Sequence, residues 1–382
     1  MHDRGRPIAF LAILAAMALI GCTTNPGTTA GPTGSPTAAG TGTPASPAAT
    51  QAGPWVPEYV DGVLQPLPDG FPDQEITLMV PDDSLAEHVL MTDLQAAARE
   101  MSPVPIVVET RTDFEAFGTW DALKQFAGTK QADDGYLNIV FSIGSIADLH
   151  TAPVTSELGL TLDNVGEVVQ LETRPYVVVQ CAEVEWEPTW QALMDRIKSK
   201  PGTVRFMGGG PGTGTDMVFA HYINILGVGN LYDKASINHI NVGGVADRTT
   251  ATAACEGDLT VSTLDAAPPH IDGGRLDVIL VSGTERLPQY PDAPSRSELG
   301  IEQDASSSTK QLVVSGVVPD LHVAWLYELW SKAGASEDYQ EARLGTPGTI
   351  IQMFDPAKTE ETNAAVYALL DKLTRDLGIH IP

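Results

Sequence analysis

A glycine-rich run between a predicted strand and a predicted helix is the strongest chemical signal in the sequence. It reads Gly-Gly-Gly-Pro-Gly-Thr-Gly-Thr-Asp over residues 208–216. Glycine lets the backbone approach a ligand closely, Thr215 or Asp216 can cap the helix, and N–H groups at a helix start favour an anion. The run lacks the Lys-Ser/Thr of a Walker loop and the acidic partner of a dinucleotide-binding fingerprint. It predicts a cradle for an anion or a polar ligand, and a glycine-rich turn without a ligand is the alternative.

The sequence carries no residue pattern that predicts catalysis. It contains no G-x-S-x-G, H-E-x-x-H or EF-hand pattern, and its histidines are scattered. Asp82 and Asp83 could be paired carboxylates for acid–base work, but adjacent aspartates before a helix also act as caps. His221 lies in an apolar helix, where a packed or hydrogen-bonded histidine is expected. We therefore expect a protein that is not an enzyme and that holds no metal and no cofactor.

The N-terminal residues have the pattern of a lipoprotein signal peptide over residues 1–21. Arg4 and Arg6 precede an apolar stretch of 13 residues, 8–20, which is shorter than the ~20 that span a bilayer. Leu-Ile-Gly-Cys at 19–22 resembles a bacterial lipobox, in which the cysteine is acylated and becomes the new N-terminus. We expect Cys22 to anchor the chain to membrane lipid on the extracytoplasmic face of the cell membrane. An ordinary secretory peptide is the alternative.

The composition after the signal peptide separates a tether from a folded part. Residues 23–53 contain only Thr, Pro, Gly, Ala, Ser, Asn and Gln, which offer no charge and nothing for a packed core. We therefore expect residues 22–70 to be a tether with a lead-in. The net charge of −27 becomes −28 without residues 1–21, which carry Arg4, Arg6 and Asp3. Such a charge repels nucleic acid, so we exclude nucleic acid as a partner.

Two cysteines remain in the folded part. Cys181 falls at the end of a predicted strand and Cys255 at the end of a predicted helix, with no C-x-x-C or Cys/His metal spacing. A disulfide needs Cα atoms within about 7 Å of each other. The sequence leaves open whether the two cysteines form a disulfide or stay as buried thiols.

Strand-like runs alternate with helix-like runs from residue 75 onward, which predicts an α/β fold with mostly parallel sheets. The predicted strands are residues 75–80, 105–109, 137–141, 176–180, 204–207, 237–242, 258–262, 278–282 and 310–318. The predicted helices are residues 84–100, 119–126, 189–200, 216–226, 247–255, 320–333, 336–344 and 357–377.

The first predicted helix begins with the capping-box pattern Ser-Leu-Ala-Glu at 84–87. Its apolar spacing predicts one buried face. That face would be formed by Leu85, Val89, Leu90, Leu94 and Ala97.

A succession of short motifs resembles one family of solute receptors. The motifs are Phe-Pro-Asp leading into Ile-Thr-Leu-Met-Val-Pro at 71–81, Asp-Gly-Tyr at 134–136, Lys-Pro-Gly at 200–202, the glycine-rich run at 208–216, Val-Gly-Gly at 242–244, Pro-His-Ile-Asp-Gly-Gly-Arg-Leu at 269–276, Ser-Gly-Thr-Glu-Arg-Leu-Pro at 282–288, Tyr-Pro-Asp-Ala-Pro at 290–294 and Glu-Leu-Gly at 298–300. In this order they look like the Bug-type receptors of tripartite tricarboxylate transporters. The resemblance covers residues 71–382.

The resemblance implies a two-lobed periplasmic-binding-protein fold with a small organic ligand, usually a carboxylate, in a cleft between the lobes. Residues 71–173 plus 292–382 would form lobe one, and residues 174–291 lobe two. Carried over to the matching positions, the ligand-binding residues would be Ser142, Ser145, Gly212, Thr213, Gly214, Thr215, Gly243, Gly244 and Asp265.

The chain departs from this family after its first predicted strand. Members usually continue from Val-Pro with an aromatic residue, Pro-Gly-Gly and an aspartate, whereas this chain has Asp82, Asp83 and Ser84, and the helix begins at once. The glycine-rich turn of the next loop is replaced by residues 111–117. The two aspartates put negative charge where members offer N–H groups. This charge argues against a di- or tricarboxylate ligand. We expect residues 82–84 to contact a part of the ligand that is neutral, hydroxylated or cationic.

These observations favour a lipid-anchored solute-binding protein that closes its lobes on a small organic ligand and delivers it to integral membrane transporter subunits. A receptor that has lost transport and acts as a sensor or interaction protein is one alternative. A secreted α/β enzyme with the cleft as its active site is the other.

Overall fold

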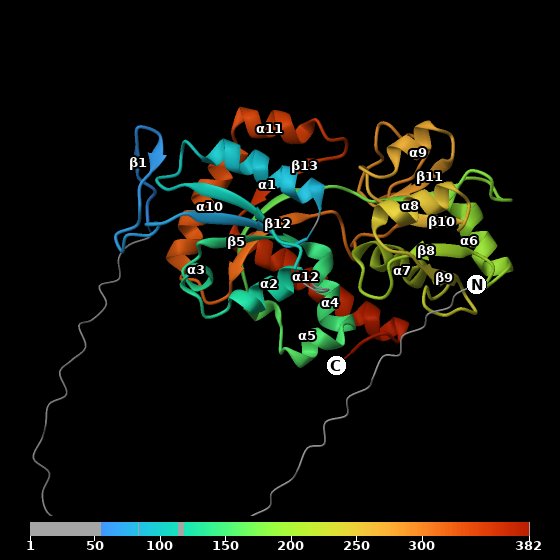
Figure 1. The fold of residues 1–382 in the computed structure, drawn as a ribbon. Helices are drawn as coiled ribbons and strands as arrows, with labels where there is room; N and C mark the ends of the chain where they lie inside the picture. The colour runs from blue at the N-terminus through green and yellow to red at the C-terminus, as the bar shows by residue number, and fades with distance from the viewer. Residues whose placement is uncertain (1–54, 83, 114–117, 382) are drawn as a thin grey trace, which may run out of the picture. The chain divides into compact units, whose positions relative to one another are not determined.

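The computed structural model describes residues 55–82, 84–113 and 118–381. The fold consists of two larger β-sheets with helices around them and a two-stranded sheet near the start (Figure 1). We refer to the parts built on the six-stranded and the five-stranded sheet as the first and the second lobe. The lobe boundaries proposed from the sequence stay a prediction.

The first lobe has a sheet in the order β13-β6-β12-β5-β3-β4. Its strands are β3 (Ile76–Val80), β4 (Ile106–Thr110), β5 (Leu137–Ser142), β6 (Val165–Thr173), β12 (Lys310–Ser315) and β13 (Ile350–Phe354). The α-helices that belong with it are α1 (Leu85–Ala98), α2 (Thr119–Phe126), α3 (Lys130–Asp133), α4 (Asp148–Thr151), α5 (Pro153–Glu157), α10 (Asp320–Gly334), α11 (Glu337–Leu344) and α12 (Pro356–Leu377). Short 3-10 helices lie at η1 (Ile143–Ala147) and η2 (Leu162–Asn164).

The two faces of this sheet bury different helices because side chains alternate along each strand. Leu78 and Val140 pack with α1 and α10, whereas Met79 and Phe141 pack with α2 and α12.

The second lobe has a sheet in the order β11-β7-β10-β8-β9. Its strands are β7 (Val177–Cys181), β8 (Arg205–Gly208), β9 (Asn238–Asn241), β10 (Leu259–Ser262) and β11 (Leu276–Val281). Its helices are α6 (Trp190–Ser199), α7 (Gly214–Ile225), α8 (Val245–Ala253) and α9 (Pro268–Asp272), and η3 (Ser297–Leu299) lies on the way back to the first lobe.

Both sheets are mixed, so the expectation of mostly parallel sheets is wrong. Strands β3, β4 and β5 pair in parallel, as do β8, β9 and β10, but β12, β6, β13, β7 and β11 pair antiparallel. The chain passes between the sheets at 173–177 and again at 281–310. The strands that flank both passages, β6, β7, β11 and β12, all make antiparallel pairs.

Residues before the predicted start of the folded part are already packed. Strands β1 (Tyr59–Val60) and β2 (Val63–Leu64) form a hairpin, and Leu64 and Leu67 are buried in the core with α1 and α10. The indole of Trp325 donates a hydrogen bond of 2.9 Å to the carbonyl of Gln65. The lead-in from residue 55 is thus part of the first lobe.

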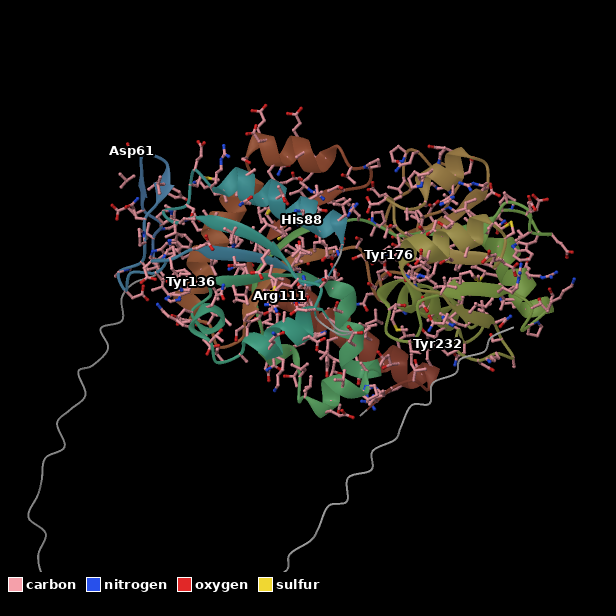
Figure 2. All side chains as sticks on the ribbon, in the orientation of Figure 1. Asp61, His88, Arg111, Tyr136, Tyr176 and Tyr232 are labelled. Carbon is pink, nitrogen blue, oxygen red and sulfur yellow. A yellow bond between two sulfur atoms is a disulfide. The ribbon has the colours of Figure 1, made fainter. Side chains whose placement is uncertain are left out.

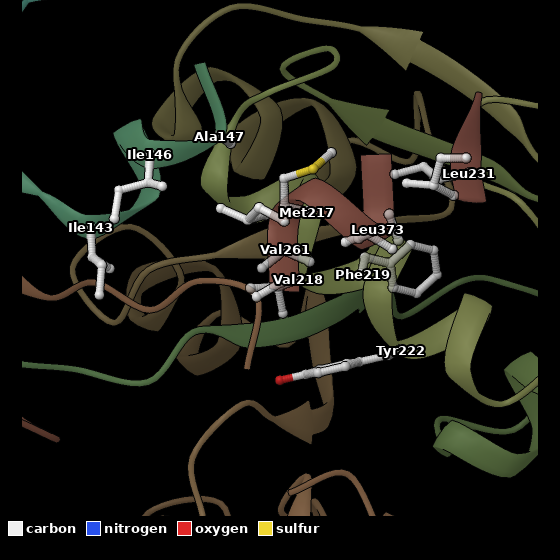
Figure 3. Packing of buried hydrophobic residues seen from close by; sticks show 14 of the residues in the cluster. Ile143, Ile146, Ala147, Met217, Val218, Phe219, Tyr222, Leu231, Val261 and Leu373 are labelled. Carbon is white, nitrogen blue, oxygen red and sulfur yellow. The ribbon is translucent and has the colours of Figure 1, made fainter. Parts of the chain in front are cut away.

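One hydrophobic cluster contains residues of both lobes. Met217, Val218, Phe219 and Tyr222 of α7 lie in the same buried cluster as Ile143 and other residues of η1 and α12 (Figure 3). The contact of α7 with η1 and with α12 is therefore apolar and well packed.

Cys181 and Cys255 form a disulfide with their Cα atoms 5.4 Å apart. The bond joins the end of β7 to the segment after α8, within the second lobe. Of the two alternatives that the sequence left open, the structure has the disulfide and not two buried thiols.

The buried face of helix α1 overlaps the predicted face but is rotated from it. Leu90 and Leu94 are buried as predicted, whereas Leu85 is 75% exposed and Val89 43% exposed. Glu87, Met91 and Ala98 are buried in addition. Among the described residues no helix is both long and apolar enough to cross a bilayer.

Candidate functional site

The loops that follow the parallel strands gather at one edge of each sheet. In the first lobe β3 and β5 end at Val80 and Ser142, and Lys310 at the start of β12 pairs with Ser142. In the second lobe β8 and β10 end at Gly208 and Ser262. Ligands of open α/β sheets bind outside the carboxyl ends of such strands. These two edges are therefore where a binding site is expected.

The two chain segments that cross between the lobes are hydrogen-bonded to each other. The amide of Arg174 donates to the carbonyl of Ser308 at 3.1 Å, and the amide of Ser308 donates to the carbonyl of Arg174 at 3.0 Å. Arg174 also binds Asp265 through Nη1 at 2.6 Å. Asp265, a predicted ligand contact, thus has an ion-pair partner in the crossing segment.

The glycine-rich loop lies directly against the first lobe. A Cβ on Gly214 would come 2.6 Å from Oγ of Ser306 and 3.3 Å from Cα of Gly144 in η1. A Cβ on Gly212 would come 2.3 Å from Oγ1 of Thr151 in α4. Gly212 and Gly214 are therefore needed where the loops of the two lobes touch, because any side chain there would push them apart.

A carboxylate of the chain itself occupies part of the glycine-rich loop. Asp216 is completely buried, and its side chain accepts the amides of Gly209 and Gly210, both at 3.0 Å. His239 at 2.7 Å and Arg248 at 3.3 Å complete its shell. The helix begins earlier than predicted, with Thr213 at the N-cap position. Asp216 thus shows that the loop binds an anion, but these two amides are already taken.

The other predicted contacts in the second lobe differ in how far their polar groups are already hydrogen-bonded. The Oγ1 of Thr215 is buried and has no hydrogen-bond partner in the described structure. The hydroxyl of Thr213 donates to the carbonyl of Gly210 at 3.0 Å. Gly244 is the N-cap residue of α8, where a Cβ would meet nothing within 4 Å, and Gly243 lies beside Asp247.

A buried charge pair on the first-lobe edge was not predicted from the sequence. The ammonium of Lys310 contacts the carboxylate of Glu87 and the hydroxyl of Ser142, and Ser142 donates to Glu87 at 3.0 Å. Burial, the largest single effect, lowers the pKa of Lys310, but the charge and hydrogen bond of Glu87, together with Tyr176 and Asp82, outweigh it and raise the pKa above its usual value. The pair joins α1 to β12 and β5 at the edge where a ligand would arrive.

The residues after β3 act as helix caps. The amide of Ser84 donates to Oδ1 of Asp82 at 2.9 Å, and Oγ of Ser84 accepts the amide of Glu87 at 3.3 Å. The capping box is only half formed, because the carboxylate of Glu87 binds Lys310 instead of returning to Ser84. Asp83 lies outside the described residues.

Two further carboxyl groups near the lobe contact have strongly shifted pKa values. Burial, together with the charge of Asp121, raises the pKa of Asp148 to about 8. Its Oδ1 would be 3.4 Å from a Cβ on Gly212. Burial raises the pKa of Asp304 to about 7, although Arg296 and the hydroxyl of Tyr222 partly offset the shift. Both groups therefore hold a proton more readily than ordinary aspartates do.

Tyr176 lies near the end of the first crossing, just before β7 (Figure 2). Burial raises the pKa of its hydroxyl, and the charges of Lys310 and Arg248 partly offset the shift. Tyr176 therefore brings a phenol close to the charged groups of both lobes.

Ser145, a predicted contact in η1, accepts a hydrogen bond of 2.9 Å at its carbonyl from the indole of Trp120.

Most predicted site residues that the structure describes lie on these two edges, but the charge pair of Glu87 and Lys310 beside them was found only in the structure. Glu87 and Lys310 are 223 positions apart in the chain. The sequence signal that could have found Glu87 is an acidic residue among the apolar positions of an otherwise amphipathic helix.

Solved structures of periplasmic binding proteins share this fold. BugD aligns with a TM-score of 0.63 and 16% identity, covering 81% of this chain and 99% of that one. MatC from Rhodopseudomonas palustris, solved with bound malate, gives 0.63 and 18%, covering 79% and 99%. A second R. palustris protein, solved with adipate, gives 0.64 and 18%, covering 81% and 98%. The protein thus has a two-lobed periplasmic-binding-protein fold, as the resemblance implied.

The profile described as tripartite tricarboxylate transporter family receptor matches residues 86–342, well over half of the chain. The chain therefore belongs to this receptor family, which confirms the resemblance seen in the motifs. A comparison with curated proteins gave no match.

Proposed function

We propose that the protein is a lipid-anchored, extracytoplasmic receptor that binds a small carboxylate-bearing solute between its lobes and delivers it to the membrane subunits of a tripartite tricarboxylate-type transporter. The observation that carries this proposal is the contact of Gly144 with Gly214, where loops from the ligand edges of both sheets meet. Membership of a receptor family supports binding rather than catalysis.

The ligand carboxylate would be held by groups from both lobes. Lys310 supplies the positive charge on the first lobe, and the unpartnered Oγ1 of Thr215 supplies a hydroxyl on the second. Two solved structures of the same fold contain malate and adipate, which supports a carboxylate as the recognised group. The further proposed contacts are Asp82, Asp83, Ser84, Ser142, Ser145, Gly212, Thr213, Gly214, Gly243, Gly244 and Asp265.

Closure would be a rotation of the lobes about the two crossing segments. The paired amides and carbonyls of Arg174 and Ser308 hold these segments together. Such hinges absorb the dihedral change in a few residues while the packed lobes move as units.

The test is to purify the protein natively, extract any bound small molecule and identify it by mass spectrometry. Its affinity is then measured calorimetrically with the wild type, Lys310→Met and Lys358→Met. Lys358 is the control because it lies in an exposed pair with Glu361 on α12. We expect Lys310→Met to weaken binding at least tenfold and Lys358→Met to leave it unchanged. Equal affinity in all three proteins would contradict the site.

Delivery to a transporter is tested separately, by uptake of the identified solute in cells with and without the receptor. Loss of uptake on deletion and recovery with the wild type but not with Lys310→Met are expected.

A further inference from the structure

Three potential metal ligands meet at the end of α12, on residues that the proposed ligand site does not use. They are His150 in α4, Asp371 in α12 and His380 after α12. One ligand atom from each lies within 4.8 Å of the others. Nδ1 of His150 is 3.9 Å and Nδ1 of His380 is 3.8 Å from the same carboxylate oxygen, Oδ1 of Asp371.

His150 is buried in a way that leaves a nitrogen without a partner. The residue is 2% exposed, and its Nε2 is buried with no hydrogen bond in the described structure. Nδ1 is the ring nitrogen that faces Asp371, so Nδ1 is the atom that would bind a cation there.

The backbone already holds the three groups together. The amide of Ile381 donates to the carbonyl of His150 at 2.7 Å, which fixes the C-terminal residues against α4. Asn230 donates to the carbonyl of Leu377 at 3.1 Å, just before the tail. These backbone contacts help to place His380, whose Nδ1 also lies 3.1 Å from Oγ1 of Thr374.

We propose that His150, Asp371 and His380 form a binding site for Zn²⁺ or a similar first-row divalent cation. Imidazole nitrogens and a carboxylate oxygen suit such ions, and three protein ligands with a water molecule make four-coordinate zinc. Ligand atoms at about 2.0–2.2 Å from zinc lie roughly 3.3–3.6 Å apart in a tetrahedron. The distances to Asp371 are a few tenths of an ångström longer than this, which small side-chain rotations remove.

The sequence could not show this site, because its ligands come from distant segments and follow no short spacing. The proposal does not depend on the proposed solute. It gives the chain a link between the C-terminal tail and α4, whose Thr151 lies against Gly212 of the glycine-rich loop.

Arg375 competes with the metal. Its guanidinium binds both oxygens of Asp371, with Nη2 at 2.8 Å from Oδ1, and is largely exposed. The ion pair of Arg375 with Asp371 must open before a cation can bind Asp371. Removing the arginine charge should therefore strengthen metal binding.

The experiment is titration of Zn²⁺ into the chelator-treated, full-length folded chain, followed by calorimetry. We expect His380→Ala and His150→Gln to weaken binding at least tenfold and Arg375→Gln to tighten it several-fold. His88→Ala is the matched control, because His88 is exposed on α1 and hydrogen-bonds Thr110. Co²⁺ in place of Zn²⁺ should give the visible absorption of a four-coordinate site.

Thermal unfolding of each apo variant separates loss of the site from loss of the fold. His380→Ala is the decisive variant, since it lies outside the helices. Zn²⁺ affinity unchanged in His380→Ala, or unchanged in Arg375→Gln, would overturn the proposal.

Discussion

Lys310 decides what charge the first-lobe edge offers to a ligand. A lysine ammonium has three donors, and Glu87 and Ser142 accept two of them. Glu87 also neutralises its charge, and Asp82 adds a carboxylate at the start of α1. The positive end of that helix is therefore already occupied by acidic groups. This edge should accept no more than one ligand carboxylate.

We predict that monocarboxylates raise the thermal stability of the wild type, whereas citrate and succinate do not. In Glu87→Gln, Lys310 loses its charged partner, and citrate or succinate should then bind. A hydrogen bond to a charged group is worth about 1.5–3 kcal/mol, or roughly 10–150-fold in affinity. A thermal-shift panel with neutral polyols and amino acids checks this, with Glu361→Gln as the exposed control. Strong stabilisation of the wild type by citrate would sink the idea.

Asp148 should make the protein less stable as pH rises. Its pKa is about 8 in the folded chain and near 3.8 when unfolded, so the folded state holds the extra proton between these values. The contribution of Asp148 to stability is then fully present below the unfolded pKa and is lost as pH rises from 3.8 to about 8.

Asp148→Asn should therefore gain stability over wild type at pH 8, on the order of 1–3 kcal/mol, and show little gain at pH 4.5. Urea unfolding at both pH values measures this. Asp304, with a pKa of about 7, is present in both proteins and does not enter the difference. A gain of the same size at both pH values would contradict the role of Asp148.

Among the elements, those with local signals were predicted best. Helix α2 matches its predicted range, and α6 starts after its predicted cap Thr189, whose side chain accepts the amide of Ala192. Strand β6 was missed because polar residues interrupt its apolar pattern. Its buried Glu172 is paired with Arg343 from α11, at 2.9 Å through both nitrogens. A partner so distant in sequence leaves no local pattern.

The difference between local and long-range signals also explains which parts of the candidate site could be predicted. The position of the glycine-rich loop follows from a strand, a run of glycines and a helix, all of which are local. Its internal anion, Asp216, and the pair of Glu87 with Lys310 depend on which strands become neighbours. The buried face of α1 is rotated relative to the predicted face, because the side chain of Glu87 points inward to Lys310 and Leu85 is left in solvent.

The η1 and α7 elements can approach closely because both carry glycine at the contact. We predict that Gly144→Val and Gly214→Val keep the fold but lose ligand binding by at least tenfold, since the new side chain meets Ser306 and the opposite backbone. Calorimetry with the identified ligand measures the affinity, and circular dichroism the fold. Gly345→Ala at the C-cap of α11 is the control, because a Cβ there makes only ordinary contacts, 3.5 Å from the carbonyl oxygen of Ala342. Wild-type affinity in both valine variants would rule out a functional lobe contact.

At the scale of the whole molecule, the disulfide closes a loop that contains β8, the glycine-rich loop and β9. The two cysteines are 74 residues apart. Closing a loop of this length in the unfolded chain is worth about 4 kcal/mol in the chain-entropy treatment. We predict that the double variant Cys181→Ser, Cys255→Ser loses a few kcal/mol of unfolding free energy. Urea unfolding of oxidised wild type and the variant checks this, and a loss below about 1 kcal/mol would contradict it.

The charge of the mature chain decides how it can stay at a membrane. With a net charge of −28 after residues 1–21 leave, it is repelled by anionic headgroups, so electrostatic adsorption does not hold it there. The proposed lipid on Cys22, which lies outside the described residues, would then be the source of retention. Two acyl chains on the cysteine would anchor stably, whereas one chain binds reversibly.

We predict that Cys22→Ala either blocks processing or releases the protein from sedimented membranes, while the variant without the disulfide stays bound. Washing at high salt should leave the wild type in place, because the anchor is covalent. Retention of Cys22→Ala in the membrane fraction without detergent would show that another part of the chain provides the anchor.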